Sequence, residues 1–365
     1  MNKNILAISN PGFMLGGGEH SFLDLLTHLP RQWKAHAVVP EDGELKRRLE
    51  TRGIDSVVIP LHPIRPWNVF KILDSLMTLA RACRKLNPDL LYCNGSRAAF
   101  YGGITGRLLG LPSLWHCRIT EPDPLLDILL VRLSSRIIVN SRATGGRFKP
   151  RVMRKVRVVY NGIDRCYFKE TPLDPPRTLK EGWKVILMVG RVSRWKRHDV
   201  ALGGFETIAT AEPDAHLVCL GAMDEKEPEW WTYLLAKSRN SPFPHRIHWM
   251  GPVEDVRPWY RAARVLIMPS ENEPFGRVLV EAMTCGVPVV ATQSGGAPEI
   301  MRDGVDGILV SPGKADELAE AVLSLLRNEN LRNSMVRSAM ERAKMFSLDN
   351  HVKRMVQVFE EVSGQ

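Results

Sequence analysis

The chain has 365 residues, of which 44% are hydrophobic and 25% are charged. This composition is typical of a globular protein and excludes disordered and fibrous classes. Because chains longer than about 300 residues rarely fold around one core, two domains are expected. No apolar run approaches the ~18 residues of a membrane span, and the apolar stretch 5–8 is too short for a signal peptide. These features predict a cytoplasmic protein.

The formal net charge of +10 is distributed unevenly along the chain. Residues 1–165 hold 25 Lys and Arg against 13 Asp and Glu, whereas residues 166–365 hold 25 against 27. Such asymmetry indicates an acidic partner, either an anionic membrane surface or a phosphorylated substrate. The alternative is a solvated basic surface. Nucleic acid is not expected as a partner, because no nucleic-acid-binding motif accompanies the charge.

Strand-like and helical segments alternate through the chain. The first half predicts strands at 4–9, 34–39, 56–59, 90–93, 113–117, 136–139 and 156–159, with helices at 19–29, 45–52 and 67–86. A proline-rich segment at 171–176 reads as a linker. The second half predicts strands at 184–189, 216–220, 247–250, 265–268 and 287–291, with helices that include 278–284 and 315–326. This alternation predicts an α/β protein with two doubly wound, Rossmann-like domains facing a central cleft.

A glycine-rich turn follows the first predicted strand and opens the first helix. Glycines such as Gly16 and Gly17 let the backbone approach a ligand, and the N–H groups that begin a helix favour anions. The spacing matches neither the dinucleotide fingerprint nor the P-loop, which argues against both classes of nucleotide site. A plain tight turn is the alternative interpretation.

A second candidate phosphate site closes the first strand of the second half. Gly190 and Arg191 end this strand, and Lys196 follows five residues later. A guanidinium and an ammonium on a loop at the carboxyl end of a strand can clasp a diphosphate. Ordinary solvent-exposed loop cations are the alternative.

A pair of glutamates gives the strongest signal. Glu273 precedes a Pro-Phe-Gly turn, and Glu281 lies about two turns into the following predicted helix. The backbone amides of Phe275, Gly276 and Arg277 lie at the N-terminus of that helix, where they can donate to a diphosphate or a sugar hydroxyl. A capping carboxylate with an unrelated surface glutamate is the alternative.

Taken in order, these motifs resemble those of the retaining GT-B glycosyltransferases of family 4 (group 1). The motifs are Gly16-Gly17-x-Glu19, His116 at a strand end, Asn161-Gly162-Ile163-Asp164, Gly190-Arg191…Lys196, Glu273-x7-Glu281, Ser294-Gly295-Gly296-x-Pro298-Glu299 and Asp306-Gly307. They span nearly the whole chain, and only the complete set is specific.

The resemblance implies roles for residues of the second half. Glu281 is expected to bind the ribose hydroxyls of the donor, and Glu273 to hold the hydroxyls of the donor sugar. Arg191 and Lys196 are expected to clamp the diphosphate. The main chain of the turn that ends at Val253 is expected to border the base.

The resemblance also implies roles in the first half. The imidazole of His116, or the backbone beside it, is expected to meet the donor sugar near the reacting carbon, and a role as general base is less expected. Gly16 and Gly17 would close over the phosphates. In the second half, Arg197 stands where the family usually has a glycine after the lysine. Arg197 therefore either adds a contact or faces solvent.

No metal ion and no cofactor other than the nucleotide-sugar substrate are expected. The chain contains no Asp-x-Asp motif, so Arg191 and Lys196 would neutralise the leaving diphosphate. The six cysteines lie at least ten residues apart, which argues against a zinc ribbon. We expect an acceptor-side domain at 1–165, a nucleotide-sugar domain at 166–346 and a helix at 347–365 that returns to the first domain.

The expected activity is retaining, metal-independent transfer of a sugar from a UDP- or GDP-sugar to a glycan, lipid-linked or phosphorylated acceptor. Synthesis of cell-envelope polysaccharide or glycolipid at the inner membrane face fits the basic first half. The segment 67–85 carries apolar and basic residues at helical spacing, as a surface-binding helix would. The alternatives are a nucleotide-sugar epimerase or hydrolase on the same scaffold and a non-catalytic anion-binding protein.

Overall fold

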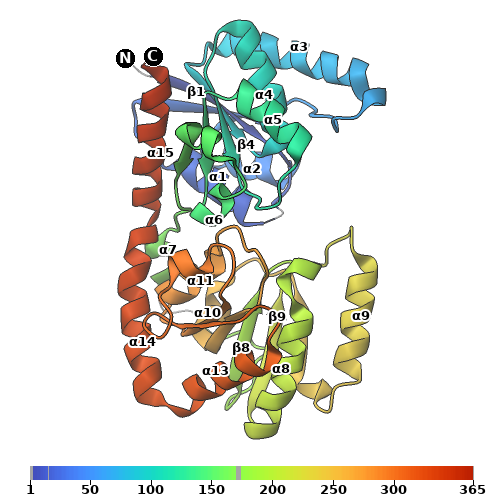
Figure 1. Ribbon diagram of the computed structural model, residues 1–365, viewed down its shortest axis with the longest axis vertical. Coiled ribbons are helices and arrows are strands. Elements are labelled where there is room, and N and C mark those ends of the chain that lie inside the picture. The colour runs from blue at the N-terminus through green and yellow to red at the C-terminus, as the bar shows by residue number, and fades with distance from the viewer. Residues whose placement is uncertain (1–2, 15, 170–173, 365) are drawn as a thin grey trace. The chain divides into compact units, whose positions relative to one another are not determined.

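The computed structural model describes residues 3–14, 16–169 and 174–364. It divides into two compact units, each shown in Figure 1. Unit 1 joins Met1–Gly162 to Leu348–Gln365, and unit 2 is Ile163–Ser347. The division falls three residues before the expected boundary at 165, and each unit is described below by itself.

Unit 1 contains a seven-stranded sheet in the order β3-β2-β1-β4-β5-β6-β7, with all neighbours parallel. The strands are β1 (Lys3–Ser9), β2 (Trp33–Val39), β3 (Asp55–Val58), β4 (Leu90–Asn94), β5 (Ser113–Cys117), β6 (Arg136–Val139) and β7 (Val156–Val158). The central strands are buried on both faces, because apolar side chains alternate between two cores.

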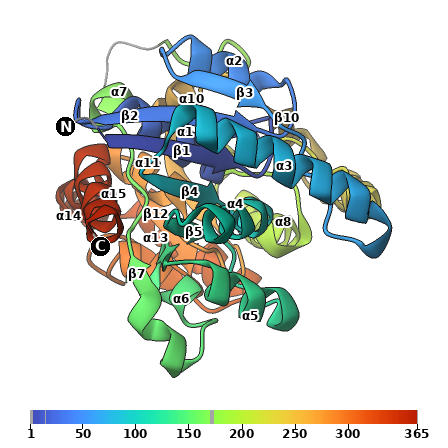
Figure 2. The same ribbon diagram turned by 90° about the horizontal axis from the view of Figure 1, so that it is seen from above.

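Helices cover both faces of this sheet. One core is formed with α1 (Gly17–Thr27), α2 (Glu44–Glu50) and α15 (Leu348–Ser363). The other is formed with α3 (Val69–Leu86), α4 (Ser96–Leu109) and α5 (Pro124–Leu133). The short elements α6 (Arg142–Gly145) and the 3₁₀ helices η1 (Pro66–Asn68) and η2 (Pro150–Lys155) complete unit 1. In Figure 2, α15 lies on one side of this sheet, and α4 and α5 lie on the other.

The carboxyl-terminal helix α15 packs on the first half of the chain. Its Phe359 ring meets Trp33 edge-on with ring centroids 5.5 Å apart. Its Glu361 pairs with Arg136 at 2.8 Å and with Arg157 at 2.5 Å. Residues separated by more than 200 positions therefore share one core.

Unit 2 contains a six-stranded parallel sheet in the order β10-β9-β8-β11-β12-β13. The strands are β8 (Lys184–Val189), β9 (Ala215–Leu220), β10 (Ile247–Gly251), β11 (Ala263–Met268), β12 (Val289–Thr292) and β13 (Ile308–Val310). One face packs on α8 (His198–Ala211), α9 (Pro228–Arg239), α13 (Ala315–Arg327) and α14 (Glu329–Arg342). The other face contacts α10 (Arg257–Ala262) and α11 (Arg277–Thr284).

The remaining short elements of unit 2 lie in its connections. They are α7 (Arg165–Lys169), α12 (Ala297–Ile300) and the 3₁₀ helices η3 (Arg194–Lys196), η4 (Pro244–Arg246) and η5 (Ala343–Phe346). The predicted α/β fold of two doubly wound sheets is confirmed. Part of the predicted linker, residues 170–173, lies outside the described residues.

Each sheet has one point at which its strand order reverses. In unit 1 this point lies between β1 and β4, and in unit 2 it lies between β8 and β11. At such a point the connections leave in opposite directions, which opens a crevice at the carboxyl ends of the strands. Ligands of doubly wound proteins bind in that crevice, so these two places are the first candidates for a site.

Candidate functional site

The reversal point of unit 2 brings together the predicted lysine and the first glutamate. Lys196 follows β8 and Glu273 follows β11. The Nζ of Lys196 lies 2.6 Å from Oε2 of Glu273, and each side chain is 11% exposed. The Lys196 side chain folds back over Gly190, where an added Cβ would lie 3.3 Å from its Cε. The strand end, the lysine and the glutamate therefore form one close-packed unit.

The turn that carries Glu273 is fixed by its neighbours. The Phe275 side chain is buried and meets Phe346 edge-on at 5.8 Å, which anchors the turn. Gly276 has φ 97°, a left-handed conformation that favours glycine. A Cβ on Gly296 would lie 2.8 Å from the Cα of Phe275, so the Ser-Gly-Gly loop packs directly against this turn. The amide of Gly296 donates to the Glu273 carbonyl at 2.7 Å.

Glu281 lies in α11 with a largely buried carboxylate. Its Oε2 accepts a hydrogen bond of 2.9 Å from the hydroxyl of Tyr260, and its Oε1 lies 3.4 Å from Nε of Arg277. Burial and the Glu281 carboxylate raise the pKa of Tyr260 well above its usual range, so the phenol remains a donor. A carboxylate offers about four lone-pair positions, and the two contacts leave acceptor positions for hydroxyl groups of a ligand.

Arg191 is placed differently from Lys196. Its Nη1 lies 3.5 Å from Oδ2 of Asp224, and its side chain is 41% exposed. The expected clamp therefore consists of one buried cation, Lys196, and one exposed cation. Val253 lies in the loop that follows Gly251, the last residue of β10, whose φ is 70°.

Arg197 has a left-handed backbone, with φ 56°. Its guanidinium pairs with Asp199 at 2.9 Å and with Glu271. The amide of Glu271 also donates to the carbonyl of Trp195 at 2.8 Å. Arg197 therefore does not simply face solvent. It ties the loop that carries Lys196 to the loop that carries Glu273.

The reversal point of unit 1 contains the glycine turn and His116. Gly16 is the N-cap of α1 and supplies no side chain to cap it, and Gly17 is its first residue. The ring of His116 is fully buried, with Nδ1 2.7 Å from the hydroxyl of Tyr92. Burial, the neighbouring Arg118 and His351 hold the pKa of His116 well below its usual value. Its ring is therefore neutral and lies inside unit 1, not on its surface.

Arg118 is a functional candidate that the sequence analysis missed. It follows β5 directly, is half-buried, and donates from Nε to Asn94 Oδ1 at 2.6 Å. Its Nη1 donates to Asn161 Oδ1 at 2.8 Å, and its Nη2 lies 3.3 Å from Ser21 Oγ. One signal was present in the sequence: an arginine immediately after a predicted strand of a doubly wound sheet.

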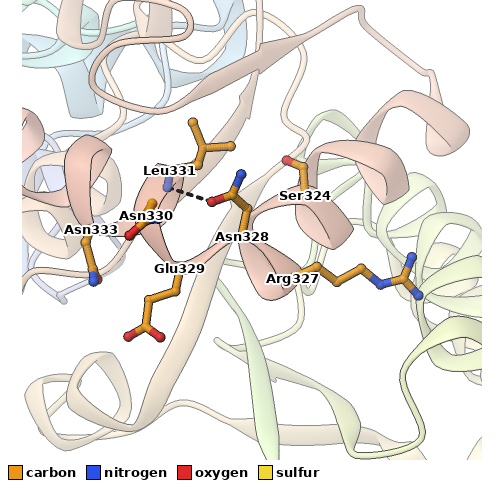
Figure 3. A pocket seen from close by; sticks show the side chains of 7 residues that line it. All are labelled: Ser324, Arg327, Asn328, Glu329, Asn330, Leu331 and Asn333. Atoms are coloured by element: carbon orange, nitrogen blue, oxygen red, sulfur yellow. Dashed lines mark hydrogen bonds between the residues drawn. The ribbon is translucent and has the colours of Figure 1, made fainter.

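Other features of the described residues do not add to these sites. Figure 3 shows a pocket between α13 and α14, in which Asn328 Oδ1 accepts from the Leu331 amide at 2.9 Å. This pocket lies near Arg327, which pairs with Glu212 before β9, at the amino end of the sheet. Among the described residues, no group of three or more His, Cys, Asp or Glu side chains is placed to hold a metal ion. Nor is any described helix long and apolar enough to cross a membrane.

Two family models match the chain in succession. The model described as Glycosyltransferase Family 4 matches residues 15–165, and the model described as Glycosyl transferases group 1 matches residues 171–342. The first match lies in unit 1 except for its last three residues, and the second lies within unit 2.

Curated relatives match over part of their length. An N-acetyl-α-D-glucosaminyl L-malate synthase from Bacillus anthracis is 32% identical over 52% of this chain and 49% of its own length. A D-inositol 3-phosphate glycosyltransferase from Salinispora tropica is 29% identical over 67% of this chain and 55% of its own length. The chain thus spans about half the length of the curated relatives it matches.

Solved structures share the fold over the whole chain. Anabaena HepE, in a complex with UDP and glucose, gives a TM-score of 0.87 at 24% identity and covers 98% of this chain and 99% of its own. Sucrose-phosphate synthase from Thermosynechococcus elongatus gives 0.80 at 18% identity, with 99% of both chains covered. Two matched family models and the two-unit GT-B architecture agree, and the chain belongs to the group 1, family 4 glycosyltransferases.

Proposed function

We propose that the protein is a retaining, metal-independent glycosyltransferase that takes a sugar from a UDP- or GDP-sugar. The observation that carries this proposal is the arrangement at the β8/β11 reversal point. There a buried Lys196–Glu273 pair, at 2.6 Å, lies beside the N-terminus of the helix that presents Glu281. The UDP, glucose and UDP-glucose bound to the Anabaena structures support a nucleotide-sugar donor.

In this proposal the diphosphate binds where positive charge is available. Cleavage of the bond between the sugar and the phosphate places negative charge on the leaving diphosphate, and fixed cations there stabilise the transition state. Lys196 and Arg191 supply that charge without a metal, and the backbone amides of Phe275, Gly276 and Arg277 add donors at the start of α11. Glu281 then accepts hydrogen bonds from the ribose hydroxyls.

Glu273 is proposed as a sugar-binding group and not as a nucleophile. Its Oε2 is held by the ammonium of Lys196, which stabilises the negative charge and lowers the reactivity of that oxygen. Its second oxygen is the one proposed to accept from sugar hydroxyls. Retention would then follow from attack on the same face that the diphosphate leaves, with the leaving phosphate taking the proton of the acceptor.

The acceptor is proposed to be a glycan, a lipid-linked molecule or a phosphorylated molecule of cell-envelope synthesis. The names of two relatives contain anionic molecules, L-malate and inositol 3-phosphate. Unit 1 also presents an apolar stripe beside basic residues on α3, which supports binding at an anionic membrane surface from the cytoplasmic side. We expect no nucleic-acid partner.

Slow donor hydrolysis tests this function without knowledge of the acceptor. We expect the purified full chain, in EDTA, to release free sugar and nucleoside diphosphate from one sugar nucleotide of a UDP and GDP panel. Proton NMR of the first product should show the anomeric configuration of the donor.

A matched variant controls for a contaminating hydrolase. Lys196→Met keeps the length of the side chain but removes the charge, and should lower the rate by about 10²–10³-fold. Activity that is lost in EDTA and restored by Mg²⁺ or Mn²⁺ would contradict metal independence. An inverted first product would contradict retention.

A further inference from the structure

The reversal point of unit 1 holds a guanidinium fixed by three other segments of the chain. Arg118 lies at the end of β5 and binds Asn94 at the end of β4, Ser21 in the second turn of α1, and Asn161 in the loop beyond β7. A Cβ on Gly18 would lie 3.3 Å from Cδ of Arg118, so the glycine turn packs directly over the side chain. These contacts hold the guanidinium in one orientation at the crevice of the sheet.

All groups that hold this cation are neutral. The amides of Asn94 and Asn161 and the hydroxyl of Ser21 carry no charge. His116, whose Nδ1 lies 3.3 Å from Nη2 of Arg118, is neutral because burial and the guanidinium itself lower its pKa. Burial raises the pKa of Tyr92, whose hydroxyl lies 3.5 Å from the same Nη2.

No carboxylate compensates the charge of Arg118 within the described part of the chain. Two other arginines of unit 1 differ in this respect. Arg147 forms a 2.6 Å ion pair with Asp127, and Arg136 pairs with Glu361 at 2.8 Å. A half-buried cation without a counterion carries a desolvation cost, and an anionic ligand would remove it.

The guanidinium also has donor capacity left. Arginine has five N–H donors, and the contacts of Arg118 with described residues use one hydrogen each of Nε and Nη1, besides those of Nη2. The second Nη1 hydrogen has no acceptor among the described residues. Planar donors of this kind match the oxygens of a phosphate or a carboxylate.

We propose that Arg118 forms an anion subsite that binds the phosphate or carboxylate group of the acceptor. The proposal rests on the proposed function, because it names the acceptor class of the same enzyme. The donor phosphates already have Lys196 and Arg191 in unit 2, whereas the reversal point of unit 1 has Arg118 as its fixed cation. A phosphate can come from a soluble acceptor or from a lipid headgroup, and the test separates the two.

Titration calorimetry on the full chain, saturated with UDP or GDP, tests the subsite. The anionic probes are sn-glycerol 3-phosphate, L-malate and dihexanoyl phosphatidate below its micelle concentration, and glycerol is the uncharged probe. We expect at least one anionic probe to bind and glycerol not to bind. Tighter binding of dihexanoyl phosphatidate than of sn-glycerol 3-phosphate would identify a lipid-linked acceptor, and the reverse order a soluble one.

Variants of equal charge change locate the binding. Arg118→Gln should lower the affinity for the anionic probe at least tenfold. Arg118→Lys keeps the charge but not the planar donors, so its affinity should lie between those of the wild type and Arg118→Gln. The control Arg31→Gln removes an exposed cation at the amino end of the same sheet and should bind like the wild type. Circular dichroism of each variant checks folding.

The outcomes separate this inference from the proposed function. If no anionic probe binds, or if Arg118→Gln binds it as tightly as the wild type, the subsite is wrong while nucleotide binding stands. If Arg118→Gln lowers the affinity for UDP or GDP but not for the anionic probe, Arg118 contacts the donor and the proposal is overturned. A protein that binds the anion through Arg118 but no nucleoside diphosphate contradicts the proposed function alone.

Discussion

Three side chains of the candidate site in unit 2 are held in place by charged or polar partners, namely Lys196, Glu273 and Glu281. The ion pair of Lys196 with Glu273 is nearly buried, and Glu281 is held by the Tyr260 hydroxyl at 2.9 Å. Removal of one partner of a buried pair leaves the other uncompensated, at a cost of about 3–5 kcal/mol. Functional tests of these groups therefore need isosteric substitutions together with a check by circular dichroism that each variant is folded.

Arg197 allows a test of backbone strain at the site. Its left-handed φ of 56° costs a residue with a side chain about 1–2 kcal/mol and costs glycine almost nothing. Arg197→Gly and Arg197→Ala both remove the ion pairs with Asp199 and Glu271, but only alanine keeps the strain. We therefore expect Arg197→Ala to unfold at a lower temperature than Arg197→Gly in thermal unfolding followed by tryptophan fluorescence.

The comparison of two variants with the same lost contacts isolates the conformational term. Equal melting temperatures for Arg197→Gly and Arg197→Ala would show that the left-handed conformation is absent in solution. A melting temperature of the wild type below that of Arg197→Gly would show that the ion pairs stabilise the fold by less than the backbone strain costs.

At the level of residues, the sequence predicts the candidates that lie on motifs but not their partners. Spacing places Lys196 and Glu273 at strand ends, where a doubly wound sheet collects ligand-binding groups. The Tyr260 hydroxyl on Glu281 and the asparagines on Arg118 join residues up to 43 positions apart. Such contacts depend on the packing of whole elements, which local patterns do not specify.

Helix α3 combines a packed face with an exposed apolar stripe. Leu79 and Cys83 are buried against the sheet. Phe70 is 83% exposed, Leu73 49% and Met77 51%, and these positions share another face of the helix. In Figures 1 and 2 the amino-terminal half of α3 extends beyond the sheet of unit 1.

The residues around this stripe fit an anionic bilayer. Trp67, which is 72% exposed, precedes the helix, and exposed basic residues lie along it. The basic residues are Lys71, Arg81, Arg84 and Lys85. Surface-binding helices insert apolar side chains into the membrane interface, and their neighbouring cations contact anionic headgroups.

Flotation with liposomes tests the membrane role of α3. We expect the full chain to float with vesicles of phosphatidylglycerol and phosphatidylcholine at low salt, and not with phosphatidylcholine alone. Because burial of each large side chain contributes about 1.5–3 kcal/mol, the double variant Phe70→Ser/Leu73→Ser should bind at least tenfold more weakly.

The control for this experiment is Val305→Ser, which removes an exposed apolar side chain of unit 2 and should float like the wild type. Binding should fall as added salt screens the headgroups. Absence of flotation at low salt, or equal flotation of the double variant, would show that the apolar stripe of α3 does not bind an anionic membrane surface.

At the level of elements, the alternation of apolar runs predicts most strands and the class of fold. The strand at 113–117 is found at the predicted bounds, because five buried residues follow a turn directly. The helix predicted at 67–86 begins as a 3₁₀ turn at Pro66–Asn68 and becomes α-helical at Val69. A proline at the first position of this turn fixes its backbone. Over a single turn, the spacing of apolar residues does not distinguish a 3₁₀ helix from an α-helix.

Across the whole molecule, two sheets of the same kind carry different chemistry at equivalent places. Unit 2 has a lysine, two glutamates and a helix N-terminus at its reversal point, and unit 1 has Arg118 and a glycine turn. The last helix of the chain belongs to unit 1, so the chain passes through unit 2 and returns. This division supports a donor site in unit 2 and an acceptor site in unit 1.

The proposed function requires that unit 2 binds a nucleoside diphosphate through Glu281 without a metal ion. Calorimetric titration of the full chain with UDP and GDP in EDTA tests it most directly, with Glu281→Gln and Glu273→Gln as a matched pair. Because a charge-assisted hydrogen bond contributes about 1.5–3 kcal/mol, Glu281→Gln should lower the affinity for the nucleotide at least tenfold. Glu273→Gln should not weaken it, since sugar hydroxyls are absent from the nucleotide and loss of the Glu273 charge leaves the buried Lys196 ammonium to pair with the diphosphate. If neither nucleotide binds the wild type in EDTA, or if Glu281→Gln binds with the same affinity, Glu281 is not the ribose-binding group of a metal-independent donor site.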